Sequence, residues 1–296
     1  MNLRELRYVL AVAEHLHFGK AAEACAVSQP TLSTQLRKLE DELGIVLFER
    51  GGRGVALTPI GAEMLPQFQA VVTAADAIQH RAAAARDPLS GRFRLGVIPT
   101  LAPYLLPLVF GPLREALPCL SLEPWEDVTN AVLAGLRAHE LDAALIATLP
   151  DGSDLTGEEL FQEPFLAALP PEHPLTARTK VAEAELAPDV LVLSDGHCLR
   201  EQALSVCSAQ PPEDAQLRAA SLPTLLNMVA AGYGTTLIPG LAAGVAQDAG
   251  LVLRPLAGGA GRMVRLVWRA SFPRREAVAA IAGVIRDRLS GFSSPL

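Results

Sequence analysis

Two cysteines nine residues apart are the side chains in this sequence with the clearest capacity for chemistry. Cys198 lies between His197 and Arg200, and Cys207 follows nine residues after Cys198. A strand and a turn are expected just before Cys198, which places its thiol near the start of a helix. A helix N-terminus and neighbouring nitrogen cations favour the thiolate, the form of cysteine that attacks oxidants and disulfides. The pattern therefore indicates redox chemistry.

The spacing of the pair limits what that chemistry can be. If the residues between Cys198 and Cys207 are helical, their Cα atoms are about 13 Å apart. A disulfide spans no more than about 7 Å between Cα atoms, so a bond between these cysteines requires the segment to unfold. Oxidation that replaces one local fold by another is one way to build a redox switch. The spacing alone fits two merely packed cysteines equally well, and Asp195 and Glu201 oppose the effect of the cations.

Other uses of cysteine have less support. Two cysteines and one histidine at this spacing match no standard zinc site, so no metal is expected, and nothing in the sequence requires another cofactor. Cys25 and Cys119 are expected to be buried, since a free cysteine behaves as a small hydrophobic residue.

The elements that must position Cys198 belong to a long C-terminal domain. Short apolar strands alternate with helices there, which predicts an α/β domain with largely parallel sheets over residues 92–296. About two hundred residues exceed what one small sheet needs, so we expect two α/β subdomains with a ligand-binding cleft between them. The expected strands are 93–98, 141–147, 165–169, 190–193, 235–238 and 264–268, and the expected helices include 101–117, 129–139 and 222–231.

The N-terminal residues 1–58 have the pattern of a winged helix-turn-helix. Two helices precede a third that Ser28 caps, with Pro30 in its first turn, where a missing N–H costs little. Leucines at helical spacing between positions 32 and 43 are expected to face inward. Two short strands around a glycine-rich turn follow and would form the wing.

A long linker helix is expected over residues 59–87, followed by a hinge at residues 88–91. Apolar side chains recur along the helix at alternating spacings of four and three, which is the heptad stripe of a helix that pairs with another. We therefore expect dimerisation through this helix, with Phe68 and Val71 facing the partner. Packing of the stripe against its own domain is the alternative.

Composition argues against several classes of protein. The chain has 296 residues and a net charge of −7; residues 1–58 carry seven basic and seven acidic side chains, so the negative charge lies in the rest of the chain. No apolar stretch reaches the roughly 18 residues that a membrane span needs. Charges within the first five residues argue against a signal peptide, so we expect a cytoplasmic protein with reduced thiols and no membrane partner.

Several motifs resemble, in their order along the chain, those of the LysR-type transcriptional regulators. They are Phe18-Gly19-Lys20-Ala21-Ala22, Val27-Ser28-Gln29-Pro30-Thr31-Leu32-Ser33, Leu39-Glu40, Leu47-Phe48-Glu49-Arg50, Leu57-Thr58-Pro59 and, late in the chain, residues 228–234. The resemblance covers essentially the whole chain. It implies a winged helix-turn-helix, a dimerising linker helix and a two-subdomain effector domain like that of periplasmic binding proteins. It also implies double-stranded promoter DNA as a partner, a homodimer that assembles into a homotetramer, and RNA polymerase as a further candidate partner.

In this architecture the second helix of the motif lies in the major groove, where its first residues meet base edges. Hydroxyl and amide side chains can read donor and acceptor patterns there, and arginines can hold phosphates. The residues expected to contact DNA are Ser28, Gln29, Pro30, Thr31, Ser33, Thr34, Gln35 and Arg37 of the helix and Arg50 and Arg53 of the wing.

Around the two cysteines the sequence is similar to the hydrogen-peroxide-sensing branch of the same family. The matching stretches are Asp195-Gly196-His197-Cys198-Leu199-Arg200, Gln202-Ala203, Cys207, Ile98-Pro99-Thr100 and Pro103-Tyr104-Leu105-Leu106-Pro107. The resemblance implies that Cys198 attacks peroxide and that Cys207 resolves the product into a reversible disulfide. It also implies a peroxide pocket formed by Thr100, Thr129, His197 and Arg269.

Two other functions are open at this point. A regulator of the same family could bind a small metabolite in its cleft, with both cysteines structural. A thiol peroxidase or oxidoreductase is the other alternative, but the helix-turn-helix and the lack of a Cys-x-x-Cys motif or a nucleotide-binding glycine-rich loop in the sequence argue against an enzyme. We therefore expect a DNA-binding regulator that senses hydrogen peroxide.

Overall fold

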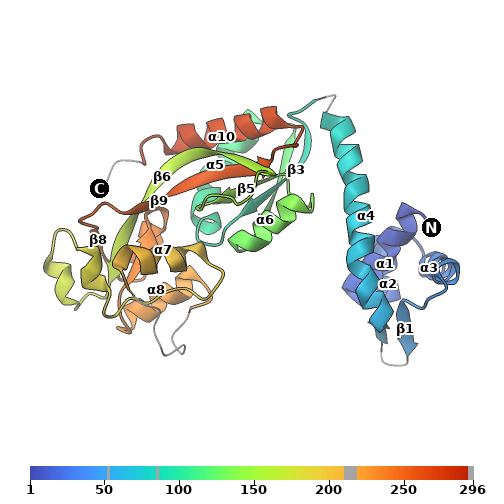
Figure 1. Cartoon of the computed structure of the whole chain (residues 1–296), viewed down its shortest axis with the longest axis horizontal. Helices are drawn as coiled ribbons and strands as arrows, with labels where there is room; N and C mark the ends of the chain where they lie inside the picture. The colour runs from blue at the N-terminus through green and yellow to red at the C-terminus, as the bar shows by residue number, and fades with distance from the viewer. Residues whose placement is uncertain (52–53, 85–86, 210–218, 293–296) are drawn as a thin grey trace. The chain divides into compact units, whose positions relative to one another are not determined.

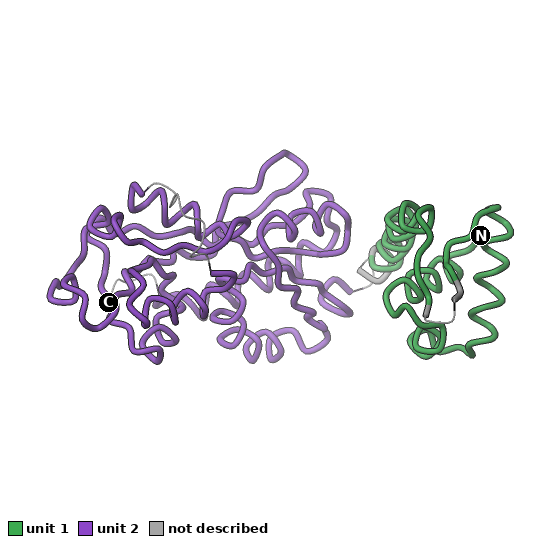
Figure 2. The backbone as a smooth tube through the Cα atoms, turned by 90° about the horizontal axis from the view of Figure 1, so that it is seen from below, with its two compact units in different colours: residues 1–82 green, residues 83–296 purple. Residues whose placement is uncertain are grey.

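The structure is a computed structural model that describes residues 1–51, 54–84, 87–209 and 219–292. The chain divides into two units, residues 1–82 and residues 83–296 (Figure 2). Each unit has hydrophobic core residues of its own. Among the described residues, no helix is both long enough and apolar enough to cross a membrane.

Helices and one β-hairpin make up the first unit. They are α1 (Leu3–His15), α2 (Phe18–Ala24), α3 (Gln29–Leu43), β1 (Phe48–Gly51), β2 (Gly54–Leu57) and α4 (Pro59–Ala84) (Figure 1). Ser28 caps α3 as expected, because its Oγ accepts a hydrogen bond from the amide of Thr31 at 3.3 Å. Leu32, Leu36 and Leu39 are fully buried in the core of this unit, so the predicted inward face of α3 is confirmed.

The wing is fixed to α3 by a buried carboxylate. Glu40 accepts hydrogen bonds at Oε1 from the amides of Leu47 (2.8 Å) and Phe48 (3.2 Å). These bonds satisfy two backbone donors where the chain leaves α3 and enters β1. The position of the wing is thus set by the same helix that carries the candidate DNA-reading residues.

Only part of the apolar stripe predicted for dimerisation is exposed on α4. Phe68 is buried with Val72 in the core of its own unit, so the prediction that Phe68 faces a partner helix is wrong. The short bundle of α1, α2 and α3 leaves an apolar face that needs a further helix to cover it, and Phe68 serves that purpose. Val71 and Ile78 lie seven residues apart on an adjacent stripe and are exposed.

The second unit contains a mixed sheet in the order β4-β3-β5-β9-β6-β7, with β8 paired to β6 (Figure 1). Helices α5 and α10 lie together on one face of the sheet and α6 lies on the other. The strands are β3 (Gly91–Val97), β4 (Leu120–Glu126), β5 (Ala143–Ile146), β6 (Leu155–Leu169), β7 (Thr236–Pro239), β8 (Val252–Pro255) and β9 (Gly261–Arg269). The α-helices are α5 (Ala102–Ala116), α6 (Thr129–Arg137), α7 (Cys198–Cys207), α8 (Leu222–Ala230), α9 (Ala243–Asp248) and α10 (Arg275–Leu289), and short 3-10 helices span Pro174–Ala177, Glu183–Leu186 and Gly240–Ala242.

Two hydrophobic cores divide this second unit into two subdomains. The first core gathers side chains of β3, α5, α6, β5 and α10, and the second gathers those of α7, α8 and β7. The strand β6 runs through both, with Leu155 in the first core and Phe165 in the second. Between these positions, Glu163 and Arg262 form a fully buried ion pair with Oε2 and Nε 2.7 Å apart. The predicted α/β domain with two subdomains is confirmed.

Two details of the predicted sheet are wrong. The sheet is not largely parallel: β3 runs parallel to β4 and β5, whereas β9 runs antiparallel to β5 and β6, and β6 runs antiparallel to β7 and β8. The chain leaves the first subdomain along β6 and returns along β9, so these strands must run in opposite directions. Residues 190–193 form isolated bridges, from Val190 to Thr235 and from Leu193 to Ala219, in place of the expected strand.

The segment expected to be a hinge, residues 88–91, is fastened to the second unit by Arg274. The guanidinium of Arg274 donates hydrogen bonds to the backbone carbonyls of Pro88 (3.0 Å), Ser90 (2.5 Å) and Arg92 (2.6 Å). The side chain is buried, so these bonds are shielded from water. Residues 88–91 are therefore held as part of the larger unit.

Replacing Arg274 by Met should loosen this segment, because three carbonyls lose their donor. We expect the free energy of unfolding of the second unit to fall by about 2 kcal/mol or more. The amides of residues 88–92 should exchange faster with deuterium. Arg275→Met changes an exposed neighbour that bonds to Ala270, and it serves as the matched control. Equal exchange in the two variants would contradict the role given to Arg274.

Candidate functional site

Cys198 lines a pocket between the two subdomains of the second unit. The pocket has a volume of about 490 Å³. The start of α6 and the segment after β5 line it from the first subdomain, and the start of α7 lines it from the second. The structure thus brings Thr129 to the same pocket as His197 and Cys198, although Thr129 precedes them by 68 residues or more in the sequence.

One continuous helix, α7, begins at Cys198 and ends at Cys207, so the predicted helix between the two cysteines is confirmed. All four cysteines of the chain are free thiols. Nine residues make about two and a half helical turns, so the two side chains leave α7 on opposite faces with Cα atoms about 13 Å apart. Cys198 is half-buried and packs against the core of the first subdomain, whereas Cys207 is fully buried in the core of the second.

The thiol of Cys207 is held in its protonated form. Burial raises the pKa of Cys207 to about 11, with a smaller contribution from the carboxylate of Glu183. Because the thiolate is the reactive form, roughly one Cys207 in a thousand is reactive at pH 8. Cys207 is therefore poorly suited to attack an oxidant at neutral pH.

The other two cysteines differ from each other. Cys25 is half-buried in the first unit, and this burial raises the pKa of its thiol. Cys119 is exposed, so the prediction that it is buried is wrong. It lies in the turn before β4, where its carbonyl accepts a hydrogen bond from the amide of Gly91 at 2.9 Å, and so its backbone is fixed while its side chain reaches the surface.

The charge of Arg200 is largely offset by carboxylates. Its guanidinium Nε lies 3.1 Å from Asp195 Oδ1 and 3.5 Å from Glu201 Oε1, and the side chain is nearly buried. Arg200 therefore anchors the start of α7, and Asp195 and Glu201 offset its charge, which agrees with the opposing effect expected from the sequence. His197 is the N-cap residue of α7 and lines the pocket.

Two buried polar atoms of the pocket, Thr129 Oγ1 and Gln202 Oε1, have no hydrogen-bond partner among the described residues. The amide of Gln202 is oriented by its other end, since Nε2 donates a hydrogen bond to the carbonyl of Ala147 at 2.8 Å. Buried polar groups are nearly always paired, so these two atoms mark a place for a small polar molecule. Gln202 is not among the predicted pocket residues, although it belongs to a stretch that resembles the peroxide-sensing branch. Its position one helical turn after Cys198 is the signal that could have placed it in the pocket.

Thr100 and Arg269 do not line this pocket. The hydroxyl and the carbonyl of Thr100 accept hydrogen bonds from Arg262, at 2.8 Å and 2.9 Å. Arg269 donates hydrogen bonds to the carbonyl of Leu136, at the C-terminal end of α6, and to that of Leu141, between α6 and β5. In this conformation both residues hold the framework of the first subdomain, and their part in a peroxide pocket stays a prediction.

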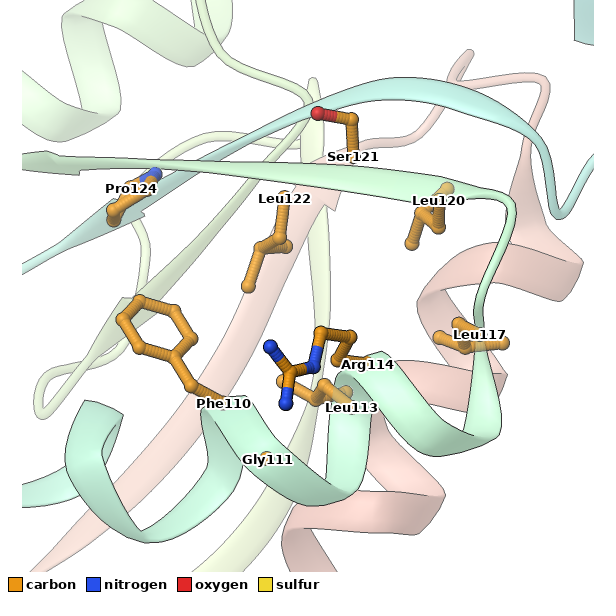
Figure 3. A pocket seen from close by; sticks show the side chains of 9 residues that line it. All are labelled: Phe110, Gly111, Leu113, Arg114, Leu117, Leu120, Ser121, Leu122 and Pro124. Atoms are coloured by element: carbon orange, nitrogen blue, oxygen red, sulfur yellow. The ribbon is translucent and has the colours of Figure 1, made fainter.

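A larger pocket of about 550 Å³ lies between α5 and β4 (Figure 3). Phe110 and several leucines line it, and Arg114 extends into it from α5. Its lining, as far as the structure describes it, contains no thiol, imidazole or carboxylate. The pocket at Cys198 is therefore the candidate site for redox chemistry.

The predicted DNA-contacting residues of α3 gather at the start of that helix. Ser28, Gln29, Pro30, Thr31, Thr34 and Arg37 are exposed, and Ser33 and Gln35 are half-buried. Hydroxyls, amides and one cation thus share an open surface, as a helix in a DNA groove requires. Arg50 lies in β1 with its side chain outside the described part of the structure, and Arg53 lies outside the described residues altogether.

A winged helix-turn-helix joined to a two-subdomain α/β domain with a thiol-containing pocket defines a DNA-binding regulator. The family described as "Bacterial regulatory helix-turn-helix protein, lysR family" matches residues 3–62, and "LysR substrate binding domain" matches residues 86–290. The chain belongs to this LysR family of regulators.

Within the family, the chain is similar over its whole length to proteins named OxyR. It is 41% identical over 295 residues to "DNA-binding transcriptional dual regulator OxyR" of Escherichia coli strain K12, covering 98% of this chain and 97% of that protein. It resembles the solved structure of a full-length cysteine-to-aspartate variant of Pseudomonas aeruginosa OxyR, with a TM-score of 0.70, 38% identity and coverage of 97% of this chain and 98% of that one. It also resembles a cysteine-to-serine mutant of Corynebacterium glutamicum OxyR with hydrogen peroxide bound, with a TM-score of 0.67, 33% identity and coverage of 98% and 93%.

The surroundings of the cysteines predict an order of alkylation. With iodoacetamide at pH 8, Cys207 should react at least roughly tenfold more slowly than Cys198, because Cys207 is fully buried and its pKa is about 11. Time-resolved peptide mass spectrometry measures the order of alkylation, and Cys207 reacting as fast as exposed Cys119 would contradict it.

Between about pH 9 and pH 11 the thiol of Cys207 ionises in the unfolded chain but not in the folded one, so the free energy of unfolding should fall as the pH rises through this range.

Proposed function

We propose that this protein is a transcription regulator that senses hydrogen peroxide through Cys198 and Cys207. The observation that carries the proposal is the pocket, in which the half-buried thiol of Cys198 lies with two unpaired buried atoms, Thr129 Oγ1 and Gln202 Oε1. Hydrogen peroxide is small and uncharged and both donates and accepts hydrogen bonds, so it suits a hydroxyl and an amide oxygen beside a thiol. The similarity to OxyR proteins supports the same substrate.

The reaction has two oxidative steps. The sulfur of Cys198 attacks one oxygen of peroxide, the O–O bond breaks, and Cys198 sulfenic acid and one water are formed. The sulfur of Cys207 then attacks the sulfur of Cys198, the S–OH bond breaks, and a disulfide and a second water are formed. His197 lines the same pocket, and we propose that it relays the proton of the Cys198 thiol to the leaving hydroxide. A cellular dithiol reductant returns the disulfide to two thiols.

The residues outside the pocket enter this scheme only after a movement. Thr100 would have to give up its hydrogen bonds with Arg262, and Arg269 its bonds to the end of α6, before either could contact peroxide. Closure of the disulfide unfolds α7, whose two faces pack against different subdomains. We propose that the resulting change between the subdomains alters how the DNA-binding units are presented to the operator.

We further propose that α3 reads double-stranded promoter DNA, with RNA polymerase as a candidate partner at the same promoter. Hydroxyl and amide side chains at the start of the helix suit base edges, and the cations suit phosphates. The base-reading residues are Thr31, Ser33, Thr34 and Gln35, the helix-start residues are Ser28, Gln29 and Pro30, and the phosphate-holding residues are Arg37, Arg50 and Arg53.

Two apolar surfaces support self-association. Val71 and Ile78 form an exposed apolar stripe on α4, which suits a dimer of linker helices. Phe110 lines the pocket between α5 and the edge strand β4, Trp125 lies beside it on β4, and both side chains are exposed. This apolar surface suits a second contact between effector domains. Two different interfaces of this kind would join two dimers into a homotetramer.

Cysteine variants test the proposed sensing reaction. A few equivalents of peroxide should remove two thiols per chain from the wild type and restore them after reduction. Cys198→Ser should keep its Cys207 thiol, because the attacking sulfur is gone, and Cys207→Ser should accumulate the sulfenic acid of Cys198. Cys119→Ser, a change of an exposed thiol, is the control and should respond like the wild type. Peptide mass spectrometry that finds a dominant disulfide through Cys25 or Cys119 would refute the scheme, and rapid, steady peroxide turnover in the presence of a dithiol reductant would point to an enzyme.

A charge in the α4 stripe tests the proposed dimer. In Ile78→Glu, two carboxylates would face each other in an apolar interface, which costs several kcal/mol, so the dissociation constant should rise at least roughly a hundredfold. Gln79→Glu adds the same charge at the next exposed position and should leave the assembly intact. Light scattering at micromolar concentration reports the mass. An unchanged assembly for Ile78→Glu would exclude pairing through this stripe.

A further inference from the structure

Gln202 lies where α7 touches the first subdomain, one helical turn after Cys198. Residues four apart lie on the same side of a helix, and both side chains line the pocket. The other side of α7 carries Ala203 and Cys207 into the core of the second subdomain. Gln202 is thus the polar residue of α7 that reaches across to the neighbouring subdomain while sharing a face with the reactive cysteine.

The two ends of the Gln202 amide have different surroundings. Nε2 donates a hydrogen bond to the carbonyl of Ala147 at 2.8 Å, which joins α7 to the end of β5 in the first subdomain. Oε1 is buried in the pocket region and has no partner within the described part of the chain. A flipped amide would set its oxygen against the carbonyl oxygen of Ala147, so the amide is oriented with its acceptor free.

We infer that Gln202 is a positioning residue with opposite effects on the two steps of the peroxide reaction, an inference that rests on the proposed function. Oε1 accepts a hydrogen bond from an O–H of peroxide and holds the oxidant against the sulfur of Cys198, which speeds formation of the sulfenic acid. Nε2 ties α7 to Ala147, which slows closure of the disulfide, because Cys198 reaches Cys207 only after α7 unfolds. The residue makes the attack fast and the structural change slow.

The position of the hydrogen bond between Gln202 and Ala147 explains why it affects closure of the disulfide. Cys198 is the first residue of α7 and must travel toward Cys207, so the start of the helix, up to and including Gln202, has to leave its place. The hydrogen bond to Ala147 is then lost in the open form. One hydrogen bond of net strength typical for proteins changes the opening equilibrium by roughly three- to tenfold, and the closure rate should change by the same factor.

Measuring the two steps separately tests this inference. In a Cys207→Ser background the reaction stops at the sulfenic acid, and quenched-flow trapping with a sulfenic-acid reagent and mass spectrometry gives the rate of attack. In the full chain with both cysteines, excess peroxide completes the first step rapidly, and the rate of disulfide formation then reports closure. Gln202→Met preserves the length of the side chain and removes both polar atoms. Gln247→Met makes the same change at an exposed position of α9 and is the matched control.

We expect Gln202→Met to slow the attack by roughly three- to tenfold and to speed closure by roughly three- to tenfold. Gln202→Glu removes the donor, keeps acceptor oxygens and adds a negative charge that repels the carbonyl of Ala147, so it should also speed closure. It keeps the role of the hydrogen bond to Ala147 testable if Gln202→Met folds poorly. The control should change neither rate.

Other outcomes overturn the inference. Unchanged rates, or two rates that move in the same direction, would show that Gln202 only packs or only stabilises α7. An unchanged rate of attack with faster closure would remove the role of Oε1. Failure of the proposed function looks different, because peroxide would then leave Cys198 of the wild-type chain unmodified before any variant is compared.

Discussion

The helix between Cys198 and Cys207 keeps the two cysteines too far apart to form a disulfide. It holds the Cα atoms of the two cysteines about 13 Å apart, with the side chains on opposite faces, whereas a disulfide allows about 7 Å at most between Cα atoms. The reduced helix and the disulfide therefore exclude each other, which is the requirement for a two-state switch. The helix is anchored at both ends, since Arg200 pairs with carboxylates near its start and Cys207 is fully buried near its end. Oxidation has to supply the free energy that breaks these contacts.

A second connection between the subdomains is held by a buried ion pair. Glu163 and Arg262 are fully buried where β6 and β9 pass from one subdomain to the other. Glu163 also accepts a hydrogen bond from the amide of Leu241 at 3.0 Å, and Arg262 donates to Thr100, so the polar atoms of the pair are well satisfied. Breaking such a pair leaves an uncompensated buried charge and costs several kcal/mol. We therefore expect the ion pair to persist on oxidation, so that unfolding of α7 would release the subdomains on the side of the thiol pocket.

Much of this arrangement follows from local sequence patterns. The cap at Ser28, the inward leucines of α3 and the helix that begins at Cys198 were predictable, because each depends on neighbours within one or two turns. The features that were predicted wrongly, or were not predicted, depend on contacts between distant residues. Phe68 is buried because the N-terminal bundle lacks a cover, and Arg274 fixes residues 88–91 from more than 180 residues away in the sequence. The unpaired oxygen of Gln202 is likewise set by Ala147, on the other subdomain, and helical spacing alone shows only that Gln202 shares a face with Cys198.

The central claim is that peroxide unfolds α7 through the bond between its two cysteines. Hydrogen–deuterium exchange of the peptide spanning residues 198–207, measured for the reduced and the peroxide-treated full chain, tests it most directly. Protection should fall by at least roughly a hundredfold on oxidation, because the helical hydrogen bonds of α7 are lost with the fold. The Cys207→Ser variant should keep its protection after its sulfenic acid has formed, since no bond pulls the helix apart. A chain that contains the disulfide between Cys198 and Cys207 and still protects α7 would contradict the claim.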